Sequence, residues 1–205
     1  MPFTVMKSEK KAVLGGTFDP VHMGHINLFH SVNDLTDITT LYVIPAYVSN
    51  FKRERHTASF DDRMAMLNLA VLDYADLYPL DSLNIVVSDR EGRRGGVSYT
   101  ADTIRALFDD LEDGGKVNFI IGDDLVEGLP EWHDSAYLKD HVRFYCFVRE
   151  SVRHSVPEGF EIHFVESRRT EASSTAVREG DFSSLSDSVR EYIEENGLYR
   201  TEGKS

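Results

Sequence analysis

Short apolar runs rich in β-branched residues alternate with longer segments of helical periodicity along most of the chain. Several runs are continuously apolar, which is typical of strands buried on both faces of a parallel sheet. The alternation predicts βαβ units and therefore an α/β, Rossmann-like fold, doubly wound around a mainly parallel sheet. The expected strands are Lys11–Gly15, Thr40–Pro45, Leu83–Ser88, Val117–Gly122, Val142–Val148 and Glu161–Val165.

Helices are expected between these strands. Ile26, Phe29 and Val32 recur at helical spacing, so they indicate one helix with a single buried face. Ser59 stands three residues before Asp62, which resembles an N-terminal capping box and predicts that a second helix begins there.

The length of the chain favours one domain. Its 205 residues contain no repeat and no linker long enough to separate two domains. We therefore expect a single domain over residues 1–205, with a core over about residues 11–199 and short tails at both ends. The segments Glu91–Gly96 and Ala46–Ala58 are expected to be loops that border the functional site.

Composition limits the partners and the location. Charged residues make up 28% of the chain, and no apolar run approaches the roughly 20 residues of a membrane span. The N-terminus lacks the apolar core of a secretory signal, and Cys146 is the only cysteine, so a reducing cytoplasm is expected. The net charge of -13 argues against a nucleic-acid surface with many phosphate contacts. We expect small ligands and neither nucleic acid nor a membrane; the sequence leaves the oligomeric state open.

The segment GGTFDPVHMGH, residues 15–25, is the most informative motif. Gly15 and Gly16 let the chain leave the first strand sharply and allow a ligand to approach the backbone. Pro20 is tolerated in a first helical turn, so a helix is expected to start between Pro20 and His22. His22 and His25 would then project from one side of that turn, where free N–H groups and the helix dipole favour an anion.

A second segment with anion-binding character lies near the C-terminus. Ser173, Ser174 and Thr175 precede a helical tract, and Arg178 follows about one turn later. The hydroxyls, the free N–H groups of a helix start and one guanidinium form a possible phosphate cradle. Taken alone, a Ser-Ser-Thr run is more often only a helix cap.

Beyond these residues, the chain resembles a known family. The motif His22-Met23-Gly24-His25 is that of the H-x-G-H nucleotidyltransferases, and within them the likeness is to the bacterial nicotinate-nucleotide adenylyltransferases. The matching segments follow the family's order: GGTFDPVHMGH, IPAYVSNFK, FDDRMAMLNLA, SYTADTI, FIIGDDLVEGLPEW, ASSTAVR and VREYIEENGLY. The resemblance implies transfer of the adenylyl group of ATP to nicotinate mononucleotide. The products are deamido-NAD and pyrophosphate, in NAD biosynthesis, and Mg²⁺ accompanies the phosphates.

The resemblance also implies which residues act. The catalytic residues are His22, His25 and Lys52, with His25 the main donor. Ser49-Asn50-Phe51 replaces the Pro-Pro-His run that the family usually has before this lysine, so Arg53 is an alternative to Lys52. The implied ATP contacts are Gly15, Gly16, Thr17, Phe18, His22, His25, Gly122, Asp124, Ser173, Ser174, Thr175 and Arg178. The implied mononucleotide contacts are Phe18, Asp19, Tyr99, Thr100 and Trp132. No protein ligand to a metal is implied.

The chemistry of the residues agrees with this reaction. Phosphoryl transfer depends mainly on positioning and on stabilising charge on phosphate oxygens. The mononucleotide phosphate is already an anion, so it can attack the α-phosphorus of ATP without a protein nucleophile. Cys146 lies inside an apolar run and is interpreted as a buried hydrophobe, not a nucleophile.

Other functions fit less well. Near relatives use the same H-x-G-H chemistry on nicotinamide mononucleotide or pantetheine phosphate, and the residues after Gly122 favour nicotinate mononucleotide. A dehydrogenase is disfavoured because G-x-G-x-x-G is absent. A non-catalytic nucleotide-binding regulator would be expected to lose a histidine or the phosphate cradle, and both are present.

Overall fold

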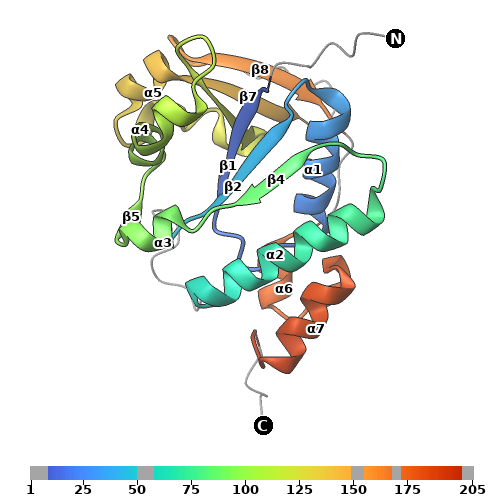
Figure 1. Ribbon diagram of the computed structural model, residues 1–205. Coiled ribbons are helices and arrows are strands. Elements are labelled where there is room, and N and C mark those ends of the chain that lie inside the picture. Colours follow the sequence, from blue (N-terminus) through green and yellow to red (C-terminus); the bar gives the residue numbers. More distant parts are fainter. Residues whose placement is uncertain (1–8, 50–57, 149–154, 168–171, 200–205) are drawn as a thin grey trace, which may run out of the picture.

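The central sheet has the strand order β4-β2-β1-β6-β7-β8 and is parallel at every pairing (Figure 1). The computed structural model describes residues 9–49, 58–148, 155–167 and 172–199. The strands are β1 (Lys11–Gly16), β2 (Thr40–Pro45), β4 (Asn84–Val87), β6 (Val117–Gly122), β7 (Val142–Val148) and β8 (Glu161–Glu166). The predicted α/β doubly wound sheet is confirmed, and each strand bound differs from its expected position by no more than one residue.

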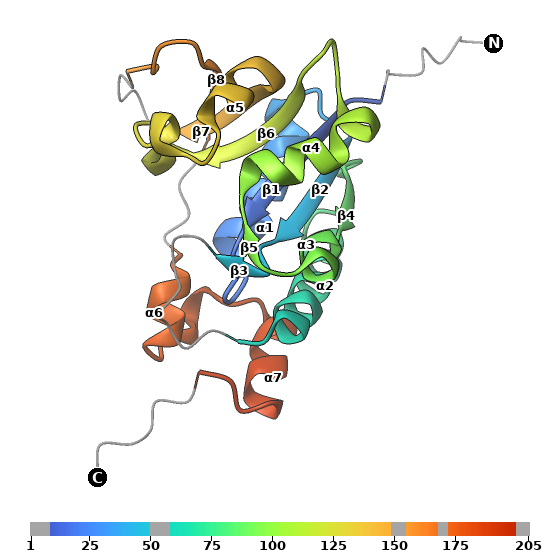
Figure 2. The same cartoon turned by 90° about the vertical axis from the view of Figure 1, so that its left-hand side faces the viewer.

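Helices cover both faces of the sheet. They are α1 (Met23–Leu35), α2 (Phe60–Leu77), α3 (Arg90–Arg94), α4 (Thr100–Leu111), α5 (Ser135–His141), α6 (Ser174–Arg178) and α7 (Asp187–Glu195), with 3₁₀ turns at Asp123–Leu125, Leu129–Glu131 and Phe182–Ser184. Figure 2 shows α4 in front of the sheet and α1 behind it. The predicted cap of α2 is present, since Ser59 Oγ accepts a hydrogen bond from the Asp62 N–H at 3.0 Å.

The hydrophobic core lies in two layers, one on each face of the sheet. Along β1, Ala12 and Leu14 join the layer beneath α1, α2 and α7, whereas Val13 joins the layer beneath α4 and α5. All three side chains are almost fully buried. This burial on both faces explains why the run is continuously apolar in the sequence.

One expected loop contains a helix. The segment Glu91–Gly96 was expected to be irregular, but α3 covers Arg90–Arg94 and ends where the Gly95 N–H donates to the Glu91 carbonyl at 2.9 Å. Gly95 has a φ of +69°, which suits a glycine at a helix end. The two-residue strands β3 (Val48–Ser49) and β5 (Val97–Ser98) pair in a separate parallel ribbon that the sequence did not indicate.

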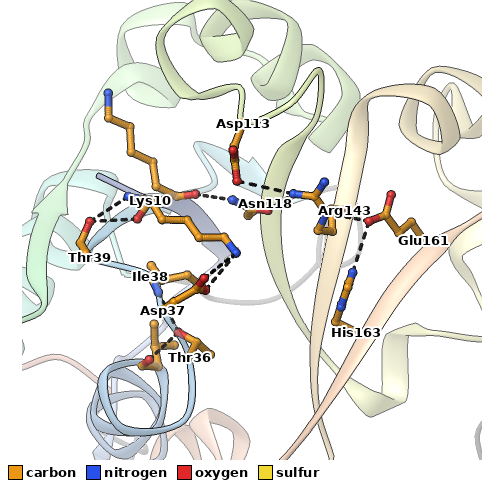
Figure 3. Close-up of polar contacts among 12 residues, drawn as sticks. Lys10, Thr36, Asp37, Ile38, Thr39, Asp113, Asn118, Arg143, Glu161 and His163 are labelled. Carbon is orange, nitrogen blue, oxygen red and sulfur yellow. Dashed lines mark hydrogen bonds and ion pairs between the residues drawn. The ribbon is translucent and has the colours of Figure 1, made fainter. Parts of the chain in front are cut away.

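Polar side chains link the amino ends of β6, β7 and β8, away from the carboxyl edge of the sheet (Figure 3). Asn118 is fully buried, donates to the Lys11 carbonyl at 2.8 Å and accepts from Arg143 Nη1 at 3.1 Å. Arg143 Nε donates to Glu161 Oε1 at 2.6 Å, and Lys116 Nζ lies 3.1 Å from Glu161 Oε2. These bonds tie neighbouring strands together at their first residues.

Glu161 should make stability depend on acid pH. Burial opposes ionisation of Glu161, but bonds from Arg143, Lys116 and His163 outweigh it and lower the pKa to about 2 from 4.5. The stabilisation is therefore complete above about pH 4.5 and is lost as the pH falls toward about 2. Urea unfolding across this range should show that Glu161→Gln is less stable than the parent at neutral pH and that the gap closes in acid. Glu166→Gln, at the other end of β8, is the control. If the difference in stability between Glu161→Gln and the parent stayed the same in acid, the role of Glu161 in the pH dependence would be contradicted.

Candidate active site

A pocket of about 630 Å³ opens at the carboxyl ends of β1 and β6. The strand order reverses at this pair, because β2 lies beyond β1 on one side and β7 beyond β6 on the other. Open α/β sheets bind ligands at this kind of switch point. Gly15, Gly16 and Thr17 line one wall as the chain leaves β1, and Gly122 lines the facing wall at the end of β6.

Two histidines face each other in the pocket wall. The ring centroids of His22 and His25 are 3.9 Å apart, and both residues line the pocket. The helix begins at Met23, not between Pro20 and His22 as expected, because His22 has extended backbone angles and serves as the N-cap. Its carbonyl accepts from the His25 N–H at 2.8 Å, while its own N–H donates to His25 Nδ1 at 3.2 Å. The backbone of the motif therefore fixes the orientation of the His25 ring.

Gly24 is required by packing within the motif. A Cβ at this position would lie 3.0 Å from Cε1 and Nδ1 of His22 and 3.2 Å from Cβ of Ala172. Any larger residue would displace the His22 ring or push away the segment that leads into α6. The glycine thus lets the two histidines and the C-terminal segment meet in one small volume.

Aromatic side chains line another part of the pocket. Trp132 is half-buried, lines the pocket and packs edge-on against Phe144 with ring centroids 6.3 Å apart. Tyr99 is the N-cap residue of α4 and lines the pocket together with Thr100. Its ring lies against that of His133, with ring centroids 4.3 Å apart. Trp132 therefore combines a core contact with a face on the pocket.

The pocket also contains carboxylates. Asp123 and Asp124 follow β6, and a Cβ at Gly122 would lie only 2.6 Å from Asp124 Oδ1. Glu91 is 3% exposed, accepts from Thr103 Oγ1 at 2.7 Å and pairs with Arg94 Nη2 at 2.5 Å. Sequence reasoning missed Glu91, because nothing in its highly charged segment distinguishes it from a solvated acid. No lysine or arginine lines the pocket among the residues that the structure describes.

The Ser-Ser-Thr segment lies next to this pocket. Ala172 lines the pocket, and α6 begins directly after Ser173, which caps it by accepting from the Thr175 N–H at 3.2 Å. Ser174 Oγ donates to the Pro20 carbonyl at 3.0 Å, and Arg178 donates to Thr175 Oγ1 at 3.0 Å and to the Asp19 carbonyl. The structure thus joins the start of α6 to the loop that precedes α1, although these α6 residues do not line the pocket.

The other predicted site residues lie elsewhere. Phe18 and Asp19 are buried and do not line the pocket. Phe18 packs against the His25 ring with centroids 5.0 Å apart, so it supports that ring from behind. Lys52 and Arg53 lie outside the described residues.

Comparisons with known proteins identify the family. The Cytidylyltransferase-like family model matches residues 13–180. A probable nicotinate-nucleotide adenylyltransferase of Oceanobacillus iheyensis is 35% identical over 91% of this chain and 95% of its own length. The chain belongs to the nicotinate-nucleotide adenylyltransferase family. A second family member, from Halalkalibacterium halodurans, is 34% identical over 92% of this chain and 90% of that protein.

Solved structures share the fold of this nicotinate-nucleotide adenylyltransferase family member. The nicotinic acid mononucleotide adenylyltransferase of Plasmodium falciparum, complexed with NaAD, covers 93% of this chain and 97% of its own with a TM-score of 0.75. A putative nicotinate-nucleotide adenylyltransferase from Vibrio parahaemolyticus covers 94% and 96% with a TM-score of 0.62. Their sequence identities of 18% and 17% make these likenesses of fold.

The buried cysteine is not placed for catalysis. Cys146 is fully buried in β7. Burial, and to a smaller extent the negative charges of Asp123 and Asp124, raise the pKa of its thiol to about 12. The thiol therefore stays protonated, as expected of a small buried hydrophobe.

No group of three or more histidines, cysteines or acids in the described part of the chain could hold a metal ion. None of the described helices is long and apolar enough to cross a membrane.

Proposed function

We propose that the protein transfers the adenylyl group of ATP to nicotinate mononucleotide, forming deamido-NAD and releasing pyrophosphate. The observation that carries the proposal is the pair His22 and His25, facing each other in a pocket at the switch point of the sheet. Family membership supports the same reaction, because the relatives are named for it over nearly the whole chain. The pathway is NAD biosynthesis, and ATP and nicotinate mononucleotide are the two substrates.

The step is a direct displacement at the α-phosphorus. A phosphate oxygen of the mononucleotide attacks, the new P–O bond forms, and the bond to the β-phosphate oxygen breaks with its electron pair leaving on pyrophosphate. No base is needed, since the attacking oxygen carries no proton that must be removed. His25 and His22 donate hydrogen bonds to the phosphate oxygens on which negative charge increases, which is the usual source of catalysis in such transfers.

Charge balance explains why ATP enters with a divalent metal ion. The described pocket lining holds Glu91, Asp123 and Asp124 but no lysine or arginine, so it repels a bare triphosphate. We infer that Mg²⁺ arrives as part of the ATP complex and is held mainly by phosphate oxygens. Lys52 remains part of the proposal as a further cation, and Ser173, Ser174, Thr175 and Arg178 supply donors to the β- and γ-phosphates.

The pocket divides between the substrates. ATP contacts the glycine turn Gly15–Thr17, the histidines, and Gly122 with Asp124, whereas the mononucleotide lies toward Tyr99, Thr100 and Trp132. A cytoplasmic location and one nucleotidyltransferase domain over residues 1–205 complete the proposal. Cell fractionation tests the location.

The assay that tests the function follows pyrophosphate released from ATP. Nicotinate mononucleotide, nicotinamide mononucleotide and pantetheine phosphate are supplied in separate reactions. Release is expected to be fastest with nicotinate mononucleotide. A faster reaction with either other acceptor would assign the protein a different substrate, and no release with any of them would favour a nucleotide-binding regulator.

Trp132→Ala tests the division of the pocket. If the indole stacks on the pyridine ring, its loss should weaken mononucleotide binding by roughly 1–3 kcal/mol, the range for base–aromatic stacking. ATP affinity should change little, because the nucleotides contact different walls. Titration calorimetry with each substrate measures both effects. Phe144→Leu, which changes a buried residue packed against the indole and leaves the indole itself in place, is the control. A large drop in melting temperature without any change in substrate affinity would show that Trp132 serves only the core.

A further inference from the structure

Asp19 lies in the interior at the point where three parts of the chain meet. Its side chain is 1% exposed, and it stands between the glycine turn and α1. Its Oδ1 accepts from the Ala58 N–H at 2.9 Å and from the Tyr199 hydroxyl at 2.6 Å. We call Asp19, Ala58, Arg178 and Tyr199 the Asp19 cluster.

The same residue holds the guanidinium of Arg178. Arg178 donates to the Asp19 carbonyl, and its Nη1 lies 3.7 Å from Asp19 Oδ2, with only 10% of the arginine side chain exposed. The next carbonyl along the chain, that of Pro20, accepts from Ser174 Oγ at 3.0 Å. Two residues of α6 are therefore bound to the successive carbonyls of Asp19 and Pro20, and only Val21 separates these from His22.

These contacts matter because α6 cannot be stable by itself. It has only five residues, and an isolated helix of that length is unfavourable in water. Its position relative to His22 and His25 must be set by its contacts with the rest of the protein. The contacts with Asp19 and Pro20 reach the loop that leads into His22 and the first turn of α1, where His25 lies.

The groups around Asp19 include cations and a hydroxyl donor, which are complementary to its side chain. Asp19 faces the cations Arg178 and Arg63, and both attract its carboxylate. Burial and the bond to Asp19 raise the pKa of Tyr199, so the phenol keeps its proton and donates a hydrogen bond to Asp19 Oδ1. Tyr199 follows α7, so it links the C-terminal part of the chain to the loop before α1.

From this geometry we infer that Asp19 and Tyr199 are positioning residues, which set the distance between the two histidines and the phosphate-binding start of α6. They act through Arg178 and not by touching substrate. The inference rests on the proposed function, because it takes the Arg178 segment as the site of the β- and γ-phosphates. It gives Asp19 a different role from the mononucleotide contact that the family resemblance implied.

Tyr199→Phe is the most direct test, since it removes one hydroxyl and leaves the ring. We expect the KM for ATP to rise about tenfold, a factor consistent with the loss of one hydrogen bond to a charged group. The KM for nicotinate mononucleotide should change by less than about twofold, since the cluster holds Arg178 of α6, which the proposed function assigns to the β- and γ-phosphates. Tyr192→Phe is the matched control, because Tyr192 lies in the same part of the chain and donates to Asp62 Oδ1 at 3.0 Å.

A double-mutant cycle isolates the link. Asp19→Ala removes the acceptor of the Tyr199 hydroxyl, so it should raise the KM for ATP more than Tyr199→Phe does. The double variant should be no worse than Asp19→Ala alone, because both changes break the same hydrogen bond. If Asp19→Ala does not fold, Tyr199→Phe and its control still decide. If Tyr199→Phe raised the KM values for ATP and for nicotinate mononucleotide equally, the inference would be overturned. The same holds if Tyr192→Phe raised the KM for ATP as much as Tyr199→Phe does.

Arg178→Met, measured in parallel, separates this inference from the proposed function. A selective rise in the KM for ATP in Arg178→Met with no rise in Tyr199→Phe would reject only the positioning role. No change in Arg178→Met would reject the phosphate site on α6 and the positioning role together. The expected result is a rise in the KM for ATP in both Arg178→Met and Tyr199→Phe, with the KM of Tyr192→Phe unchanged.

Discussion

His25→Ala is expected to lower kcat by about 10²- to 10³-fold, or ~2.7–4 kcal/mol of transition-state stabilisation, which is typical of a lost donor to a developing oxyanion. His25 lines the pocket, and its Nδ1 accepts from the His22 N–H, so the ring has a fixed orientation. A fixed donor needs no reorganisation as charge builds on the phosphates. Single-turnover rates at saturating substrates measure the chemical step.

His30→Ala is the control for this variant. His30 lies on the same helix but does not line the pocket. Its Nδ1 is 2.8 Å from Asp81 Oδ2. It should keep kcat within about twofold of the parent, because it makes no contact in the proposed transition state. If the folded His25→Ala protein kept near-parental kcat, the catalytic role of His25 would be rejected.

Arg63→Met is expected to lower the free energy of unfolding by roughly 3–5 kcal/mol, as is typical when one partner of a buried charged network is removed. Arg63 is 4% exposed and lies on α2. Its guanidinium donates to four backbone carbonyls: Thr17 at 2.8 Å, Ala46 at 2.7 Å, Tyr47 at 3.0 Å and Ala58 at 3.4 Å. Methionine fills similar volume but leaves these acceptors and the nearby Asp19 carboxylate without their cation.

Arg93→Met provides the matched control. The Arg93 side chain is 78% exposed and pairs with Asp89 across one turn of α3, so its loss should cost no more than about 1 kcal/mol. Urea unfolding monitored by circular dichroism compares the two variants. Equal, small effects would mean that the bonds of Arg63 add nothing to stability.

The sheet was predictable because its strands are buried on both faces. Continuous apolar runs such as Val117–Gly122 and Val142–Val148 have few alternative interpretations once helical segments separate them. The ribbon of β3 and β5 was not predictable, since two residues per strand produce no periodic pattern. The helix α3 was missed for a related reason, because its five residues are nearly all charged.

The site was predictable where local chemistry is unusual. Two histidines three residues apart after a glycine turn have few structural explanations, and the structure brings both to the pocket. The roles of Arg63 and Asp19 depend on contacts between residues distant in sequence. The sequence analysis therefore did not single out Arg63, and it named Asp19 only as a ligand contact that the family resemblance implied. Such roles follow from tertiary packing, which single-residue patterns do not encode.

The central claim is direct adenylyl transfer to the phosphate of nicotinate mononucleotide, and the most direct test follows the oxygen atoms. Nicotinate mononucleotide is prepared with a heavy oxygen isotope in its phosphate and allowed to react with unlabelled ATP. Mass spectrometry of the products should find the entire label in deamido-NAD and none in pyrophosphate, because the mononucleotide oxygen becomes the new bridge. Label in pyrophosphate, loss of label from the dinucleotide, or no dinucleotide at all would contradict the account.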